Sequence, residues 1–190
     1  MQALILAAGT GSRLGKHTKE NTKCMLEVNG KTLIKHALDK INNVGIKKLI
    51  LVVGYKKDNL IAHVGTKYKN VVIEYVENPI YNKTNNIYSL FLAKDQLAKD
   101  DTLLLESDLI FDEEILRRAL NSDHKSLAVV DKYQSWMDGT AITIDENNSI
   151  TGFYSKHLFR FQDVSYYYKT VNIYKFSKNF SNNVYIPFLE

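Results

Sequence analysis

The distribution of apolar residues along the chain predicts alternating strands and helices. Residues 2–7 and 47–55 carry apolar side chains on both faces, a pattern typical of central strands in a parallel sheet. Between them, residues 31–45 repeat their apolar positions at the spacing of one helix face. The predicted inward-facing residues of this helix are Leu33, Ile34, Ala37, Leu38 and Ile41.

The same alternation continues to about residue 131. Residues 71–78, 101–108 and 126–131 read as three further strands, and residues 86–98 and 112–120 as helices. Alternating strands and helices favour a parallel α/β sheet with right-handed crossovers. In the helix over residues 86–98, the predicted inward-facing residues are Ile87, Leu90, Phe91 and Leu97.

The pattern changes near residue 140. Residues 140–156 read as a hairpin with Asn147 and Asn148 at its turn, and residues 166–177 as another alternating strand. The second half therefore adds mixed or antiparallel strands to the parallel core. Ligands of open α/β sheets bind at the carboxyl ends of the strands. That rule places the predicted site at residues 8–15, 53–55, 77–86 and 106–112.

Composition and charge narrow the class of protein. The 190 residues, 45% hydrophobic and 24% charged, fit one globular domain. The apolar runs are strand-sized, far short of the roughly 20 residues that span a bilayer, so no membrane is expected. The net charge of +4 is spread along the chain, which favours small anionic ligands over nucleic acid. Cys24 is the single cysteine, expected to serve in packing, and the chain enters a strand without an export signal, so we expect a cytoplasmic protein.

The first strand leads into the glycine-rich turn "AAGTGSRLG". Its spacing is one residue longer than the dinucleotide fingerprint, and no Gly-Lys-Ser/Thr follows as in a P-loop. Glycines nevertheless let a phosphate approach the backbone N–H groups, Arg13 offers bidentate contacts and Lys23 a mobile charge. The turn therefore predicts a phosphate site, the alternative being a simple tight turn with two solvated cations.

Residues 4–34, "LILAAGTGSRLGKHTKENTKCMLEVNGKTLI", resemble the signature of the sugar-nucleotidyltransferase superfamily. With the alternating elements, the resemblance implies a Rossmann-like three-layer α/β/α fold with a mainly parallel mixed sheet and added antiparallel strands in the second half. It also implies that Arg13 and Lys23 bind the phosphates of a nucleoside triphosphate and act in catalysis. Thr22 stands where the family usually has proline. The turn residues implied to bind the nucleotide are Leu6, Ala7, Ala8, Gly9, Thr10, Gly11 and Ser12.

The segment "ENPIYNKTNNIYSLFLA", residues 77–93, resembles the phosphocholine-cytidylyltransferase-like branch of the superfamily. In that branch the segment lies against the nucleobase, which implies base and ribose contacts from Tyr81, Asn85, Asn86 and Ser89. Amides and hydroxyls suit a pyrimidine edge, which offers both donors and acceptors. Asn85 and Asn86 fit a helix cap equally well.

The segment "LLLESDLIFDEEIL", residues 103–116, ends a strand with carboxylates that suit Mg²⁺, a cation that prefers oxygen ligands. "SDLIF" resembles the metal-binding segment of the family, which makes Asp108 the expected magnesium ligand and Glu106 a weaker candidate beside the nucleotide. The family places a second metal-binding aspartate near its C-terminal end, and none appears before Glu190. We therefore expect a single nucleotidyltransferase domain over residues 1–190 that lacks its C-terminal segment.

Three residues of the second half are candidates for binding the acceptor. Trp136 fits either packing or an aromatic wall beside a cationic head group, and Lys156 either solvent or an acceptor phosphate. "YYYKTVNIYKFS" resembles a segment of relatives that activate phosphonates and other phosphorylated small molecules, which places Asn172 near their active site.

The resemblance implies a Mg²⁺-dependent cytidylyltransferase that transfers CMP from CTP to a small acceptor and releases pyrophosphate. Candidate acceptors are phosphocholine, 2-aminoethylphosphonate and phosphoglutamine, for the decoration of surface polysaccharide or lipid, as in capsule biosynthesis. A homodimer is compatible with this interpretation. Two alternatives stay open, a hexose-1-phosphate uridylyl- or thymidylyltransferase and a non-catalytic nucleotide sensor.

Overall fold

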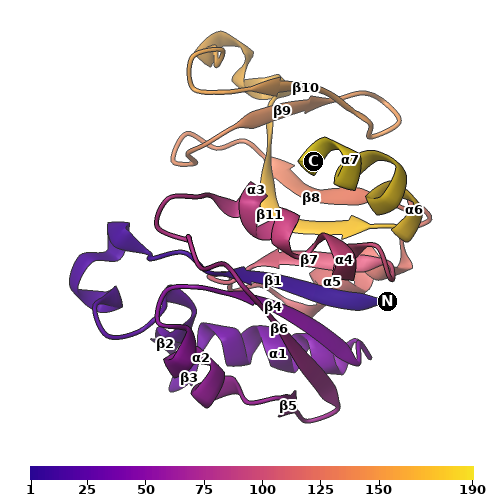
Figure 1. Ribbon diagram of the computed structural model, residues 1–190. Helices are drawn as coiled ribbons and strands as arrows, with labels where there is room; N and C mark the ends of the chain where they lie inside the picture. Colours follow the sequence, from indigo (N-terminus) through magenta and orange to yellow (C-terminus); the bar gives the residue numbers. More distant parts are fainter. The chain divides into compact units, whose positions relative to one another are not determined.

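The computed structural model describes the backbone of residues 1–190 and every side chain except those of Arg13, Lys16 and His17. The chain divides into two compact units (Figure 1). Unit 1 comprises Met1–Leu127 and Tyr174–Glu190, and unit 2 comprises Ala128–Ile173. The domain expectation, one domain over the whole chain, stays a prediction.

The core of unit 1 is a mainly parallel sheet in the strand order β7-β1-β4-β6-β5 (Figure 1). β1 pairs in parallel with β4 and β7, β4 pairs in parallel with β6, and β5 is antiparallel to β6. The strands are β7 (Thr102–Glu106), β1 (Gln2–Ala7), β4 (Lys48–Val53), β6 (Val71–Glu77) and β5 (Lys67–Tyr68). All six residues of β1 are buried, as expected for a central strand covered on both faces.

Successive residues of a strand point to opposite faces of the sheet. Because the central strands carry buried apolar residues on both faces, helices cover both. On one face Leu4, Leu6 and Val52 pack against Leu90 of α3 (Asn86–Leu92) and Leu97 of α4 (Lys94–Leu97). The C-terminal segment packs on the same cluster through residues of α6 (Lys178–Phe180), the π-helix η4 (Ser181–Tyr185) and α7 (Ile186–Leu189). The helices α1 (Leu33–Asn43) and α5 (Glu113–Asn121), which contact each other, cover the other face (Figure 1).

Short elements connect the ends of the parallel strands. After β1 the chain forms the 3-10 helices η1 (Ser12–Thr18) and η2 (Lys23–Met25). The small antiparallel pair β2 (Glu27–Val28) and β3 (Lys31–Thr32) then leads into α1. After β4, the helix α2 (Lys57–Val64) is preceded by Lys56, which has left-handed backbone angles. These connections carry the carboxyl-end loops in which the site is expected.

Unit 2 is built on a small sheet with antiparallel strand pairs. β9 (Ala141–Ile144) and β10 (Ile150–Tyr154) form an antiparallel hairpin, and β9 also pairs antiparallel with β11 (Tyr168–Phe176). β8 (Leu127–Lys132) pairs with β11. The 3-10 helix η3 (Phe161–Tyr166) precedes β11 in the chain. The residues of β11 from Tyr174 onward belong to unit 1.

The predicted fold class is confirmed: the sheet is mainly parallel with helices on both faces, and antiparallel strands follow residue 140. The five inward residues predicted for α1 are all buried. The single helix predicted over residues 86–98 is wrong, because the chain breaks at Ala93 into α3 and α4. The inward-facing position predicted for Ile87 is also wrong, since 51% of this residue is exposed in the first turn of α3. No helix among the described residues is long and apolar enough to cross a membrane.

Candidate active site

The glycine turn brings the end of β1 close to Lys23. Gly11 has φ 62°, in the left-handed region that favours glycine. A Cβ at this position would lie 3.0 Å from Cγ2 of Thr18 and 3.2 Å from Cβ of Lys23, so a side chain would have to push Lys23 away. Both the backbone angle and the packing therefore require glycine here.

The other predicted turn residues differ in exposure. The last part of β1 and the residue after it are buried. The next residues are exposed or half-buried, and a Cβ on Gly9 would meet no atom within 4 Å. The side chain of Arg13 lies outside the described residues. Buried are Leu6, Ala7 and Ala8, and more accessible are Gly9, Thr10, Gly11 and Ser12.

Lys23 and Asp108 form an ion pair although 85 residues separate them in sequence. Lys23 begins η2, and Asp108 lies two residues beyond the end of β7. The side chains are 31% and 28% exposed, so a ligand can reach both groups. The sheet edge therefore brings together the predicted phosphate-binding lysine and the predicted metal-binding aspartate.

Glu106 and Asn86 form a second polar pair at this edge. The Asn86 amide donates a hydrogen bond of 2.6 Å to Oε1 of Glu106. Burial raises the pKa of Glu106 to about 7, helped by the negative charge of Asp108 and opposed by Lys23 and the Asn86 hydrogen bond. Glu106 therefore exchanges its proton near neutral pH, close to the Lys23–Asp108 pair.

A cavity of about 320 Å³ adjoins this pair within unit 1. Asn86 and Glu106 are its polar members, and the rest of the lining is aliphatic or aromatic. The apolar lining residues are Leu6, Leu90, Leu104, Leu105, Tyr174, Phe176 and Tyr185. The low polarity of these walls explains why the Glu106 carboxyl resists ionisation.

The segment predicted to face the nucleobase is held by Asn78, which the sequence interpretation missed. Asn78 is 1% exposed, and its amide nitrogen lies 3.0 Å from Oγ1 of Thr84 and 3.1 Å from Oγ of Ser89. Its Oδ1 accepts a hydrogen bond from the Ile80 N–H at 3.1 Å. An Asn–Pro pair directly after a strand is a turn signal that could have identified it.

The remaining predicted residues of this segment have different surroundings. Asn85 caps α3, because its Oδ1 accepts a hydrogen bond from the Ile87 N–H. Ser89 is buried against Asn78, whereas Tyr81 is half-buried with its ring edge toward Tyr55, 6.0 Å between centroids. Asn85 thus follows the cap interpretation, and the base contacts of the segment stay predictions.

Tyr55 and Asn59, also missed, hold the backbone that precedes Lys23. The Tyr55 hydroxyl lies 3.1 Å from the Thr18 carbonyl oxygen and 3.0 Å from that of Lys19. The Asn59 amide donates to the carbonyl of Glu20 at 3.0 Å. These contacts attach α2 and the end of β4 to the segment that carries the loop toward Lys23.

Thr22, which stands in place of the expected proline, has φ −69° and ψ 156°, values that proline also adopts. Its hydroxyl lies 3.1 Å from the sulfur of Cys24. Burial raises the pKa of the Cys24 thiol to about 11, so the residue is an unreactive packing group as expected. The loop therefore keeps a proline-like backbone and gains a side-chain contact.

The predicted acceptor residues belong to unit 2. Trp136 is 79% exposed, Lys156 is exposed, and Asn172 lies within β11 with φ 61°. Their roles toward an acceptor stay predictions. The part of the chain that the structure describes contains no group of three or more His, Cys, Asp or Glu residues placed to hold a metal ion.

Comparison with known proteins identifies relatives of this chain. The model of the MobA-like NTP transferase domain matches residues 3–158. The chain is 30% identical to CMP-5'-(3-aminopropyl)phosphonate synthase of Streptomyces rubellomurinus, over all of this chain and 30% of that protein. It is 33% identical to CTP:phosphoglutamine cytidylyltransferase of Campylobacter jejuni, over 72% of this chain and 54% of that protein.

A sugar nucleotidyltransferase is similar too. UTP–glucose-1-phosphate uridylyltransferase AglF of Haloferax volcanii is 36% identical over 57% of this chain and 44% of its own length. The chain thus spans between about a third and a half of the curated relatives it matches.

A solved structure supports the fold. The inositol-1-phosphate CTP transferase from T. maritima superposes with a TM-score of 0.72 at 23% identity, covering 95% of this chain and 72% of that one. The resemblance to nucleotidyltransferases, including the cytidylyltransferase branch, is confirmed by the family model and by the relatives. The chain belongs to the family of the MobA-like NTP transferase domain.

Proposed function

We propose that the protein transfers CMP from CTP to a small phosphorylated or phosphonate metabolite and releases pyrophosphate. The observation that carries this proposal is the meeting of Lys23, Asp108, Asn86 and Glu106, from three separate segments, at the carboxyl edge of the unit 1 sheet. The cytidylyltransferases among the relatives support CTP as the donor.

In the proposed reaction an oxygen of the acceptor phosphate or phosphonate attacks the α-phosphorus of CTP. The bond from the α-phosphorus to the bridging oxygen breaks, and pyrophosphate leaves with that electron pair. Alignment of the reactants and stabilisation of the developing charge provide the rate enhancement. The turn over residues 9–12 offers backbone N–H groups to the phosphates, and Arg13 and Lys23 offer positive charge.

Lys23 is already paired with a carboxylate. Its ammonium pairs with Asp108, and the flexible lysine stem allows it to exchange this carboxylate for phosphate oxygens when CTP binds. Tyr55 and Asn59 fix the backbone that leads to Lys23, so its stem starts from a defined position. We propose that this exchange couples nucleotide binding to the release of Asp108.

The donor set at this edge fits Mg²⁺, which proteins bind through one or two carboxylates while phosphates and water supply the remaining oxygens. Asp108 would hold the ion, and Glu106 is the second carboxylate nearby. When bound, Mg²⁺ would supply positive charge that stabilises the negative charge developing on the departing pyrophosphate.

A pyrophosphate-release screen tests the proposal. CTP, UTP, dTTP, ATP and GTP are each paired with phosphocholine, 2-aminoethylphosphonate, phosphoglutamine and glucose 1-phosphate in the presence of Mg²⁺. We expect release with CTP and one of the first three acceptors, and loss of release when EDTA removes the metal. Release with another nucleotide only would overturn the choice of CTP.

Hexose-1-phosphate uridylyl transfer is the second candidate, favoured by the similarity to AglF. The same screen separates it, because it requires release from UTP with glucose 1-phosphate. If no pair releases pyrophosphate while a nucleotide still binds, the nucleotide-sensor alternative is supported and both enzymatic proposals fail.

A further inference from the structure

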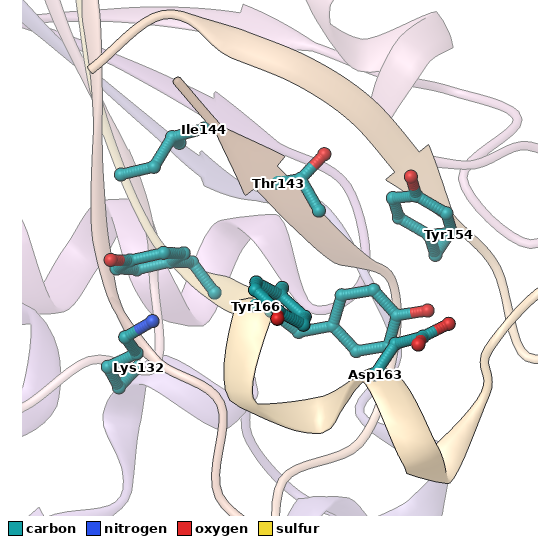
Figure 2. A pocket seen from close by; sticks show the side chains of 8 residues that line it. Lys132, Thr143, Ile144, Tyr154, Asp163 and Tyr166 are labelled. Atoms are coloured by element: carbon teal, nitrogen blue, oxygen red, sulfur yellow. The ribbon is translucent and has the colours of Figure 1, made fainter. Parts of the chain in front are cut away.

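Unit 2 contains a pocket of its own, with a volume of about 430 Å³ (Figure 2). The volume lies within the range typical of sites for small molecules. Strands β8, β9, β10 and β11 and the helix η3 supply its walls. The lining residues are Lys132, Thr143, Ile144, Tyr154, Asp163, Tyr166, Tyr167 and Tyr168.

Asp163 is the negative charge of this pocket. Among the residues that the structure describes, no side chain donates a hydrogen bond or forms an ion pair to its carboxylate, although the residue is half-buried. The hydroxyls of Tyr154 and Tyr166 likewise make no described hydrogen bond. Figure 2 shows Asp163 and Tyr154 at one side of the pocket, Lys132 at the other, and Tyr166 between them. A carboxylate beside aromatic rings is thus left to a ligand.

Lys132, the positive charge of the pocket, is already engaged. Its ammonium donates a hydrogen bond of 2.8 Å to the Ser165 carbonyl and lies 4.0 Å from the centroid of the Tyr168 ring. A tyrosine face of this pocket therefore accepts an ammonium in the protein itself. Because Lys132 is satisfied at its own side, it leaves Asp163 uncompensated at the other.

We propose that this pocket binds a small organic ammonium group, such as that of choline or an aminoalkyl compound, between Asp163 and the rings of Tyr154 and Tyr166. Ring faces attract a cation through their quadrupole, and the carboxylate adds a full negative charge. Trp136, the aromatic residue expected to face a cationic head group, does not line this pocket. The proposed cation site involves the tyrosines and Asp163, and the role expected of Trp136 stays a separate prediction.

The test uses choline as the probe in an NMR titration of the full chain without nucleotide. The neutral isostere 3,3-dimethyl-1-butanol controls for shape without charge. We expect saturable shifts for pocket residues with choline, and at least tenfold weaker binding of the neutral alcohol. Equal binding of the two probes, or shifts confined to residues outside the pocket, would overturn the proposal.

Two variants separate charge from folding. Asp163→Asn keeps the shape and removes the charge, and we expect it to weaken choline binding about tenfold or more. Tyr166→Leu keeps apolar volume and removes the ring face, and we expect binding to weaken about threefold or more. Glu146→Gln, at the exposed β9–β10 turn, makes the same charge change outside the pocket and should bind choline as the unmodified protein does. Unchanged binding in both pocket variants, with thermal unfolding showing them folded, would contradict the site.

The ammonium has two sources that the same variants distinguish. If it belongs to the acceptor, Asp163→Asn raises the KM for phosphocholine but not for glucose 1-phosphate. If it belongs to a separate amine, choline binding is lost and neither KM changes. Both results support the site. Because choline binding is measured without nucleotide, the pocket can fail or hold independently of the proposed transfer reaction.

Discussion

At the scale of single residues, Lys23 and Asp108 neutralise each other at the edge of the sheet. The pair is partly exposed, so its contribution to stability is small, up to about 1 kcal/mol. The position of Lys23 beside Gly11 of the glycine turn suits it to bind the phosphates of a nucleotide as well. The two effects can be separated by measuring stability and turnover on the same variant.

Replacing Lys23 by alanine is expected to lower turnover about 100-fold, as for loss of one preorganised charge at a reacting phosphate. Affinity for CTP should fall less, because backbone contacts and Arg13 remain. The measurements are steady-state pyrophosphate release, nucleotide titration and urea unfolding. Lys47→Ala, an exposed lysine of the same unit, is the control and should leave turnover unchanged. Equal turnover in Lys23→Ala would remove the lysine from the mechanism.

Glu106 makes stability depend on pH. Its pKa of about 7 in the folded chain exceeds the ordinary value of 4.5, so between these values the folded state holds more protons than the unfolded state. Stability therefore falls as pH rises from about 4.5 to 7, by at most about 1.4 kcal/mol per pH unit. Glu106→Gln removes the titrating group. The free energy of unfolding of this variant, relative to that of the unmodified protein, should therefore rise as the pH increases across this window. Urea unfolding at four pH values measures it, and a constant difference would contradict the assignment.

At the scale of elements, the end of β4 joins three parts of the site. The Tyr55 N–H donates to the Ala8 carbonyl at 3.0 Å, its hydroxyl reaches the carbonyls of Thr18 and Lys19, and its ring meets Tyr81. Tyr55 alone thus connects the end of β1, the loop before Lys23 and the segment after β6. This connection makes the loop position depend on α2 and β4.

Tyr55→Phe removes the hydroxyl and keeps the ring. Loss of a hydrogen bond of this kind costs about 0.5–1.5 kcal/mol, so the variant should stay folded. We expect KM for CTP to rise several-fold because the segment before Lys23 is less constrained, with a smaller change in kcat. Tyr88→Phe removes a hydroxyl for which no described hydrogen bond exists and should match the unmodified protein. A loss of stability without any change in KM would assign Tyr55 to folding alone.

Gly54 allows the strand ends to approach closely. A Cβ there would lie 2.8 Å from the Ala8 carbonyl oxygen and 2.9 Å from Cβ of Tyr81. Because one neighbour is backbone, Gly54→Ala should destabilise the protein by about 1–3 kcal/mol, the usual cost of overpacking. Gly9→Ala is the matched variant, since its Cβ meets no atom within 4 Å, and its unfolding free energy should change far less. Similar unfolding curves for the two variants would contradict this packing argument.

At the scale of the whole molecule, the sequence predicted what strong periodicity and the strand-end rule determine. The four parallel strands and α1 follow from their apolar patterns. Asp108 lies at a strand end that the rule selects, whereas Lys23 lies outside the selected ranges and was assigned its catalytic role only through the family resemblance. The strands β2, β3 and β5 were missed because two residues carry no periodic pattern, and α2 because only Leu60 and Val64 of its residues are buried. Tyr55 and Asn78 were missed because their partners are backbone or buried polar groups, which sequence spacing does not reveal.

The net charge of the whole chain, +4 at pH 7, draws a triphosphate less than the local charges do. Charges farther away than about 8 Å are screened at physiological ionic strength, whereas Lys23 acts at contact distance. We expect kcat/KM for CTP to fall as KCl rises from 50 to 500 mM, with a shallower slope in Lys23→Ala. Lys47→Ala, which lowers the net charge equally, should keep the slope of the unmodified protein. Parallel slopes in all three proteins would mean that distributed charge, rather than the lysine beside the glycine turn, attracts the nucleotide.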